Sequence, residues 1–144
     1  MKKIIIILLC LLFISCNTTG DENIIINKTA QELTAEFLSD WEAADNFYKG
    51  KMIMVTGYLL GGGNKHLDLG ERPILNNWQN QYNINDIEIN CEFDVMVVLL
   101  YSELGLKQDQ RIIIKGEYHS FLNSHEVKIL RLINCEVINF EPME

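Results

Sequence analysis

The segment from His66 to Glu71 brings three side chains that can bind metals close together in the sequence. Alternate side chains of a strand share a face, so His66 and Asp68 would lie on one side as a pair of ligands, with Glu71 near them. Metal sites in proteins need a fuller ligand set than two or three such groups. We therefore predict neither a metal ion nor a cofactor here.

Cysteine and histidine offer a second arrangement for a metal. Cys91 and Cys135 could be completed by His119 or His125 in a zinc site. The cysteines fall at inward positions of strand patterns, however, whereas the histidines fall at strand ends or in turns. We do not expect this set to meet around one ion.

The sequence lacks a recognisable arrangement for catalysis. Nucleophilic catalysis needs a nucleophile, a base and an orienting group, and no serine of the chain lies in a Gly-flanked elbow. Nuclease chemistry needs clustered acids, usually with a metal, and nearby cations, but Arg72, Arg111 and Arg131 are scattered. We predict a protein that binds rather than an enzyme.

The first residues indicate where such a protein would act. Lys2 and Lys3 precede an unbroken apolar run from Ile4 to Ile14. That run is about 16 Å long as a helix, too short for a bilayer core of about 30 Å. A basic start and a short apolar run indicate a secretory signal, so we expect residues 1–15 to be removed on export.

The leader stops at Ser15 and Cys16, which resemble a bacterial lipobox: a small residue precedes the cysteine that is lipidated and becomes the new N-terminus. Phe13 replaces the usual Leu, and Cys10 is a weaker candidate because it follows Leu9. The alternative is an ordinary signal peptide with a chance cysteine. Lipid on Cys16 would anchor the chain in the cell envelope, since two or more acyl chains give stable attachment.

The rest of the chain divides into a tether, residues 16–28, and one domain, residues 29–144. The whole chain has 12 Lys and Arg against 20 Asp and Glu, a net charge of −8. An acidic protein repels phosphate backbones and anionic lipids. We therefore expect no nucleic acid as a partner, and we expect the lipid, rather than the protein surface, to hold the domain at the membrane.

Cys91 and Cys135 are the cysteines that remain once Cys10 leaves with the leader and Cys16 takes the lipid. An even pair in an oxidising compartment is compatible with a disulfide, which would stabilise the fold by about 4 kcal/mol in the chain-entropy model. Two buried free thiols are the alternative, because cysteine is common in protein cores.

A helix is predicted at the start of the domain. Thr29, with Glu32 three residues later, has the spacing of a capping box. An apolar face follows, and Gly50 ends the helix. We expect Trp41 to lie in the core, as aromatic residues on such a stripe usually do. The whole apolar face consists of Ala30, Leu33, Phe37, Leu38, Trp41 and Ala44.

Two stretches of the domain, residues 51–61 and 110–120, have nearly the same pattern. Each places a Gly in the row that should face a core. These rows are Ile53, Val55, Gly57 and Leu59, and Ile112, Ile114, Gly116 and Tyr118. Gly inside a strand marks a bulge or a bend. Two strands bent at matched positions suit a small closed barrel in which they pair with each other.

Three further strands and a second helix complete the pattern. The strands cover residues 66–69, 87–93 and 126–140, and a change of alternation between Leu132 and Ile133 implies a bulge in the last. Asp94 can cap the helix and Gly105 can end it. The order indicates an OB-fold: an all-β, five-stranded barrel preceded by an amphipathic helix, with a helix between strands 3 and 4.

The domain also resembles a known group of proteins. The stretches NFYKGKMIMVTGYL, INCEF, QRIIIKGEY and VKILRLINCEVI resemble small bacterial OB-fold proteins of the tRNA-anticodon-binding-domain-like family, often envelope lipoproteins. The resemblance covers about residues 29–137. The family name records the fold and does not imply binding of tRNA. The connection GERPILNNWQNQYNIND departs from the family because it is richer in Asn and Gln.

OB-folds bind ligands across the second and third strands and the loops beside them. In this chain that surface would consist of Lys65, His66, Asp68, Trp78, Tyr82, Glu88, Asn90 and Glu92. Aromatic and amide side chains suit stacking on sugars or bases, or packing against a protein, whereas Glu88 and Glu92 disfavour bases on a phosphate chain. The same residues also fit a solvated barrel face on which Trp78 and Tyr82 hold a long loop.

Together these patterns predict a lipid-anchored OB-fold module that binds another envelope protein or a peptide. The alternative is a binder of oligosaccharide or another small envelope ligand. The expected location is the periplasmic side or the outer-membrane surface, and the expected membrane contact is the N-terminal lipid.

Overall fold

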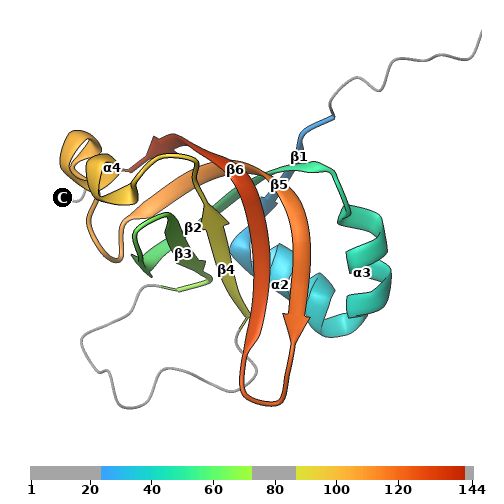
Figure 1. Ribbon diagram of the computed structural model, residues 1–144. Helices are drawn as coiled ribbons and strands as arrows, with labels where there is room; N and C mark the ends of the chain where they lie inside the picture. The colour runs from blue at the N-terminus through green and yellow to red at the C-terminus, as the bar shows by residue number, and fades with distance from the viewer. Residues whose placement is uncertain (1–23, 73–86, 142–144) are drawn as a thin grey trace, which may run out of the picture.

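The structure is a computed structural model, and it describes residues 24–72 and 87–141 (Figure 1). No helix in these two ranges combines the length and the apolar character needed to cross a bilayer. The elements in chain order are β1 (Ile26–Thr29), α2 (Ala30–Ser39), α3 (Trp41–Tyr48), β2 (Met52–Gly62), β3 (His66–Gly70), β4 (Ile87–Glu92), α4 (Val97–Leu104), β5 (Arg111–Asn123) and β6 (Lys128–Phe140).

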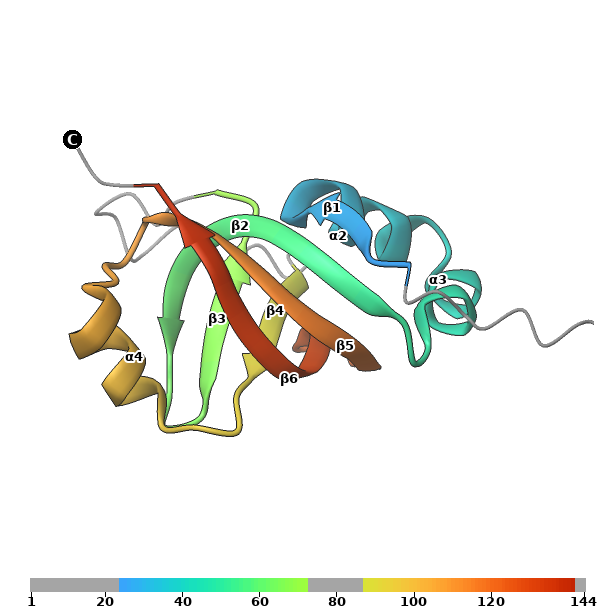
Figure 2. The ribbon, with the colours of Figure 1, turned by 90° about the horizontal axis from the view of Figure 1, so that it is seen from above.

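The strands from β2 to β6 close into a barrel. β2 pairs with β3, β3 with β4, β4 with β6 and β6 with β5, and β5 pairs back onto β2. The β4–β6 pairing is parallel, and the other pairings within the barrel are antiparallel. With α4 between its third and fourth strands, this is the predicted OB-fold. Helices α2 and α3 lie at one end of the molecule and α4 at the other (Figure 2).

The two similar stretches of sequence form β2 and β5, which pair with each other as predicted. Ile53 lies opposite Gly116, and Gly57 lies opposite Ile112. The predicted inward rows are buried along both strands. The repeated pattern thus corresponds to the seam that closes the barrel.

The two glycines of this seam have different neighbours. A Cβ on Gly57 would lie 3.1 Å from Ala30 Cβ and 3.1 Å from the Gly70 carbonyl oxygen. Because glycine has no Cβ, α2 and β3 can approach β2 closely at this position. A Cβ on Gly116 would lie 2.6 Å from Cys135 Sγ. Gly116 therefore leaves room for a sulfur atom from β6, a role that the sequence pattern did not indicate.

β6 contains the predicted bulge. Between the Glu117–Ile133 and Lys115–Glu136 pairs, β6 advances by one residue more than β5 does. Asn134 takes a φ of 53° within this step, a conformation that Asn tolerates better than most residues. The extra residue reverses the alternation, so that Leu132 before it and Cys135 after it both face the interior.

The single helix predicted at the start of the domain is two helices. α2 begins with the expected capping box, in which the Glu32 N–H donates to Thr29 Oγ1 at 3.1 Å and the Thr29 N–H donates to the Glu32 carboxylate at 2.8 Å. Asp40 then ends α2, and its carboxylate accepts a hydrogen bond from the Ala43 N–H at 3.1 Å. Asp40 is thus the N-cap of α3, a position that Asp strongly favours.

This break corrects two predictions about the core. Trp41 and Leu38 were expected on the buried stripe but are 42% and 50% exposed, because the stripe is interrupted at Asp40. Trp41 still contacts the barrel, since its ring centroid lies 6.5 Å from that of Phe121 on β5. The remaining residues of the predicted stripe are buried: Ala30, Leu33, Phe37 and Ala44.

The end of the predicted tether belongs to the fold. Ile26–Thr29 form β1, which pairs in parallel with the first half of β2, from Ile26–Ile53 to Thr29–Thr56. This edge of β2 is available because β3 pairs only with later residues of β2, from Tyr58 onward. The domain therefore begins before Thr29, and any tether from Cys16 is shorter than residues 16–28.

α4 begins later than predicted. Its N-cap is Met96, which makes no side-chain cap, so Asp94 does not cap this helix. The Val97 N–H instead donates to the Asn64 carbonyl at 2.9 Å, which ties the start of α4 to the turn between β2 and β3. Gly105, with a φ of 63°, ends α4 as expected.

Candidate binding face

The outer surface of β3 and β4 carries polar side chains over an apolar interior. The antiparallel register puts His66 opposite Glu92 and Asp68 opposite Asn90. Their inward neighbours are fully buried: Leu67, Leu69, Ile89 and Cys91 are each 0% exposed. We call the outward, half-buried residues His66, Asp68, Glu88, Asn90 and Glu92 the β3–β4 face.

Asp68 lies at the centre of the β3–β4 face. Its Oδ1 accepts a hydrogen bond from the Asn90 amide at 2.8 Å. His66 Nε2 lies 3.7 Å from its Oδ2, and Glu88 is hydrogen-bonded to the same carboxyl group. Side chains from two strands thus converge on one carboxylate.

Asp68 and Glu88 behave as a carboxyl pair. Burial raises the pKa of Glu88 to about 7, and both the charge of Asp68 and the hydrogen bond to it add to the rise. Glu88 therefore keeps its proton up to about pH 7. Loss of that proton at higher pH leaves two adjacent negative charges, which a cationic group of a ligand would stabilise.

An ion pair occupies one end of the face. Glu92 accepts hydrogen bonds from Arg131 of β6, through Nε at 2.7 Å and also through Nη2. Exposed pairs of this kind contribute little to stability, about 0–1 kcal/mol. The pairing matters more for recognition, because it neutralises Glu92 and leaves Asp68 and Glu88 as the acids that can receive a cation on the described part of the face.

The structure brings the strand residues of the predicted binding surface together. Lys65 is exposed beside them in the turn before β3, where its carbonyl accepts a hydrogen bond from the Phe93 N–H at 2.8 Å. Trp78 and Tyr82, the predicted aromatic residues of this surface, lie outside the described residues. Their stacking role stays a prediction.

Glu71 does not join His66 and Asp68 in a ligand set. Its carboxylate instead accepts a hydrogen bond from the buried Thr34 hydroxyl of α2. Among the residues described, no three His, Cys, Asp or Glu side chains are placed to hold a metal ion. What the face offers is a set of hydrogen-bond acceptors and negative charge.

Sequence reasoning missed two residues around this face. Arg131 looked isolated because its partner Glu92 is 39 residues away, and only the parallel β4–β6 register puts Arg131 opposite Asn90. The alternation of β6 places Arg131 on the outer side of the barrel, and this pattern could have indicated that it lies beside the face. Tyr101 of α4 is the other: burial raises its pKa and the charge of Asp68 adds to the rise, so Tyr101 lies near that carboxylate.

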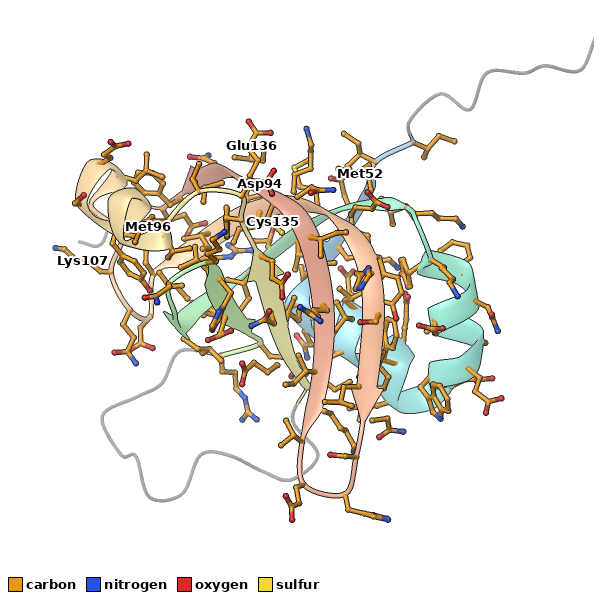
Figure 3. All side chains as sticks on the ribbon, viewed as in Figure 1. Met52, Asp94, Met96, Lys107, Cys135 and Glu136 are labelled. Carbon is orange, nitrogen blue, oxygen red and sulfur yellow. The ribbon has the colours of Figure 1, made fainter. Side chains whose placement is uncertain are left out.

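Cys91 and Cys135 meet inside the barrel. The structure holds them as free thiols, Cys91 buried and Cys135 partly buried, with their side chains in hydrogen-bond contact (Figure 3 labels Cys135 on β6). Burial raises the pKa of Cys91 well above its usual range, and the contact with Cys135 adds to the rise. The thiol therefore stays protonated at neutral pH. A disulfide between these neighbours stays a prediction.

Comparison with known proteins supports the fold. The sequence matches no family model and no curated protein. The chain is similar in structure to a proposed nucleic acid-binding lipoprotein from Klebsiella pneumoniae subsp. pneumoniae MGH 78578, with a TM-score of 0.52 and 17% sequence identity over 85% of this chain and 100% of that one. At this identity the similarity shows the fold alone, and the resemblance to the tRNA-anticodon-binding-domain-like family stays a prediction.

Proposed function

We propose that the protein is a lipid-anchored OB-fold module of the cell envelope that binds a protein or peptide partner on the β3–β4 face. The observation behind this proposal is the Asp68–Glu88 carboxyl pair, half-buried on the strands that OB-folds use for binding. The proposed role is binding and not catalysis. Lys and Arg side chains of the partner would be the groups recognised.

The proposed anchor depends on the N-terminal sequence. A basic, short apolar leader ending at Ser15 and Cys16 is typical of a lipoprotein signal. The K. pneumoniae protein of similar fold is itself described as a lipoprotein. An export leader, a lipidated cysteine and a compact binding domain together suit an envelope protein that is held at the membrane while it captures a partner.

A cationic segment of protein suits the charge of the β3–β4 face. Asp68 and Glu88 are neighbouring acceptors, and both can be negative once Glu88 loses its proton above about pH 7. Ammonium or guanidinium groups satisfy such acceptors by charge-assisted hydrogen bonds. Because the pair is half-buried, the attraction is screened less than at a fully exposed acid. A basic peptide lying across β3 and β4 would therefore bind better at pH 8 than at pH 6, where Glu88 is protonated.

Nucleic acid is the binding partner proposed for the K. pneumoniae protein. For this chain the charges oppose it, since the net charge is −8 and the central side chains of the β3–β4 face are acids. Base stacking also needs aromatic platforms, and no described residue of β3 or β4 is Phe, Tyr or Trp.

An oligosaccharide or another small envelope ligand is the second candidate. The hydrogen-bonded pair Asp68 and Asn90 favours it, since carboxylate and amide groups bind sugar hydroxyls. Sugar binding would also draw on Trp78 and Tyr82, because stacking on aromatic rings supplies much of the contact.

Two experiments test the proposal. Replacement of Cys16 by Ala should release the protein from membranes, and continued sedimentation with membranes would count against the anchor. For the partner, a photo-crosslinking amino acid at Lys65, beside the β3–β4 face, should give a discrete adduct with one envelope protein in intact cells. The same group at His125, exposed in the β5–β6 hairpin, is the control.

The adduct at Lys65 should be competed by a lysine-rich peptide and not by neutral glucan oligosaccharides or single-stranded DNA. It should also weaken in the Asp68→Asn variant. Adducts of equal yield at Lys65 and His125, or competition by oligosaccharide alone, would contradict a protein partner on this face.

A further inference from the structure

Ile24 lies at an end of the domain that also carries apolar and basic side chains. β1 and β2 run parallel, with Ile26 opposite Ile53, so Ile24 and Lys51 lie beyond the same end of this strand pair. The last turn of α3 leads directly into β2 there. We call Ile24, Ile25, Phe47, Lys49, Lys51 and Met52 the tether end of the domain.

The tether end exposes large apolar groups beside positive charge. Ile24 and Phe47 are 76% and 53% exposed. Lys49 and Lys51 are exposed, and Lys51 Nζ lies 3.6 Å from the centroid of the Phe47 ring. An aromatic ring paired with a lysine is favoured at a membrane–water boundary, because the ring can enter the apolar layer while the ammonium stays among the head groups.

The described elements at this end carry three acids, Glu42 and Asp45 on α3 and Glu117 on β5. Asp45 of α3 accepts a hydrogen bond from the Tyr118 hydroxyl at 2.5 Å, which directs it toward the barrel. Glu42 lies in the first turn of α3, at the opposite end of that helix from Lys49. Glu117 lies opposite Met52 on β5. Lys49 and Lys51 thus give the tether end exposed positive charge in a chain of net charge −8, although Asp21 and Glu22 lie three and two residues before Ile24 in the sequence.

The opposite end of the molecule lies far from this region. Met52 marks the tether end and Lys107 the end beside α4, and the two are well separated in Figure 3. A domain of this length has a radius of gyration of about 13–14 Å and hence a diameter of about 35 Å. The eight-residue step from Cys16 to Ile24 spans at most about 29 Å. Such a tether cannot turn the α4 end toward a membrane that holds Cys16.

We propose that the tether end rests on the phospholipid surface, with Phe47, Ile24 and Ile25 at the boundary of the acyl region and Lys49 and Lys51 among anionic head groups. This proposal rests on the lipid anchor proposed above. The same head groups repel the negative charge elsewhere on the domain. Attraction of the two lysines and repulsion of the remaining acids therefore both turn the tether end toward the membrane. Each contact is weak alone, but the tether keeps its local concentration high.

The test uses the full lipidated chain in vesicles of phosphatidylethanolamine and phosphatidylglycerol. An amine-reactive label and mass spectrometry report the labelling rates of Lys49 and Lys51 relative to Lys107 in the same sample. We expect these relative rates to fall by about threefold or more from detergent solution to vesicles, since two lysines at an anionic surface become less accessible. Equal relative rates in both conditions would overturn the inference.

A matched pair of variants separates membrane contact from other causes. Phe47→Ser removes the exposed ring from the tether end and should restore labelling of Lys49 and Lys51. Leu122→Ser removes a side chain of similar exposure, 56%, from the β5–β6 hairpin and should change nothing. If both variants keep the protection, or both lose it, the tether end is not the contact.

Flotation of the vesicles reports the anchor independently. A protein that floats with the vesicles but labels Lys49, Lys51 and Lys107 without the expected difference overturns this inference and leaves the anchor intact. A protein that does not float overturns the anchor and this inference with it.

Discussion

The inner and outer sides of β3 and β4 differ in every property that matters for function. The inner residues, such as Leu69 and Ile89, are fully buried and belong to one apolar core, whereas the outer residues Asp68 and Glu88 are hydrogen-bonded carboxyl groups that face solvent in part. Because successive side chains of a strand alternate between faces, one short segment serves both roles. Substitutions on the two sides should therefore separate stability from binding.

The largest effect is expected from the cysteines on the inner side. In protein isolated from an oxidising envelope we expect Cys91 joined to Cys135, and reduction should lower the free energy of unfolding by up to about 4 kcal/mol. Each thiol loses a proton and an electron to an external disulfide oxidant when the bond forms. Denaturant unfolding with and without reductant measures the loss, and mass mapping under non-reducing conditions detects the bond. Alkylation of both thiols in freshly isolated protein would contradict it.

The next effect compares adjacent residues of β3 directly. Leu69→Ala removes a fully buried side chain and should cost about 3 kcal/mol, because the cavity closes only in part. Asp68→Asn keeps the size of an outward side chain and should cost less than about 1 kcal/mol. Chemical unfolding of both variants measures the difference. Similar losses in the two would show that the faces are not separable.

A third prediction extends the inner side to the barrel seam. Gly116→Ala in reduced protein places a methyl group against Cys135 Sγ and should cost about 1–3 kcal/mol. Adding Cys135→Ala should recover part of that loss, and the double-mutant cycle measures the coupling. Gly57→Ala with Cys135→Ala is the control, since Gly57 is crowded by Ala30 and Gly70 instead. Additive effects at Gly116 and Cys135 would rule out the contact.

A further small effect on stability is expected from the outer side. The pKa of Glu88 is raised to about 7 in the folded protein, so the folded state binds more protons than the unfolded state between about pH 4.5 and pH 7. Stability from this group is therefore present at low pH and lost as pH rises through 7. Allowing for solvent screening, the change should be about 1 kcal/mol.

Glu88→Gln should remove this part of the pH dependence. Thermal unfolding between pH 5 and pH 8 measures it, with Glu126→Gln in the exposed hairpin as the control. If stability falls with rising pH as steeply in Glu88→Gln as in the wild type, the pKa of Glu88 is not raised in the folded protein.

The fold was predictable because its pattern is local and repeated. The alternation in residues 51–61, 87–93 and 110–120 assigned the inward rows correctly, and the change of alternation near Leu132 located the bulge at Asn134 to within two residues. These signals depend only on the period of a strand. The capping box at Thr29 is equally local, since both partners lie within one helical turn.

The predictions of secondary structure and packing were wrong where residues distant in the sequence, or competing local preferences, determine the structure. Asp40 has a strong tendency to cap a helix, and that tendency outweighed the apolar stripe that would have continued through Trp41. The pairing of β1 depends on the edge of β2 that β3 and β5 leave open, and that edge is set by strands distant in the sequence. The space beside Gly116 is defined by Cys135, on another strand.

For the candidate site, the sequence supplied the outward residues but not their chemistry. Alternation alone places Asp68, Glu88 and Asn90 on one side of their strands. The raised pKa of Glu88 beside Asp68 and the neutralisation of Glu92 by Arg131 follow from the strand register and from partial burial. The register cannot be derived from one strand by itself.

The most direct test of the proposed function is a titration of the lipidated protein with three probes at pH 6 and pH 8: a lysine-rich peptide, a neutral glucan oligosaccharide and single-stranded DNA. We predict that the peptide binds most tightly, that its affinity rises several-fold from pH 6 to pH 8 as Glu88 ionises, and that Glu88→Gln abolishes this rise while Glu126→Gln does not. Tighter binding of the oligosaccharide or the DNA would contradict the assignment of the β3–β4 face. So would a peptide affinity that is the same at pH 6 and pH 8 and is unchanged in Glu88→Gln.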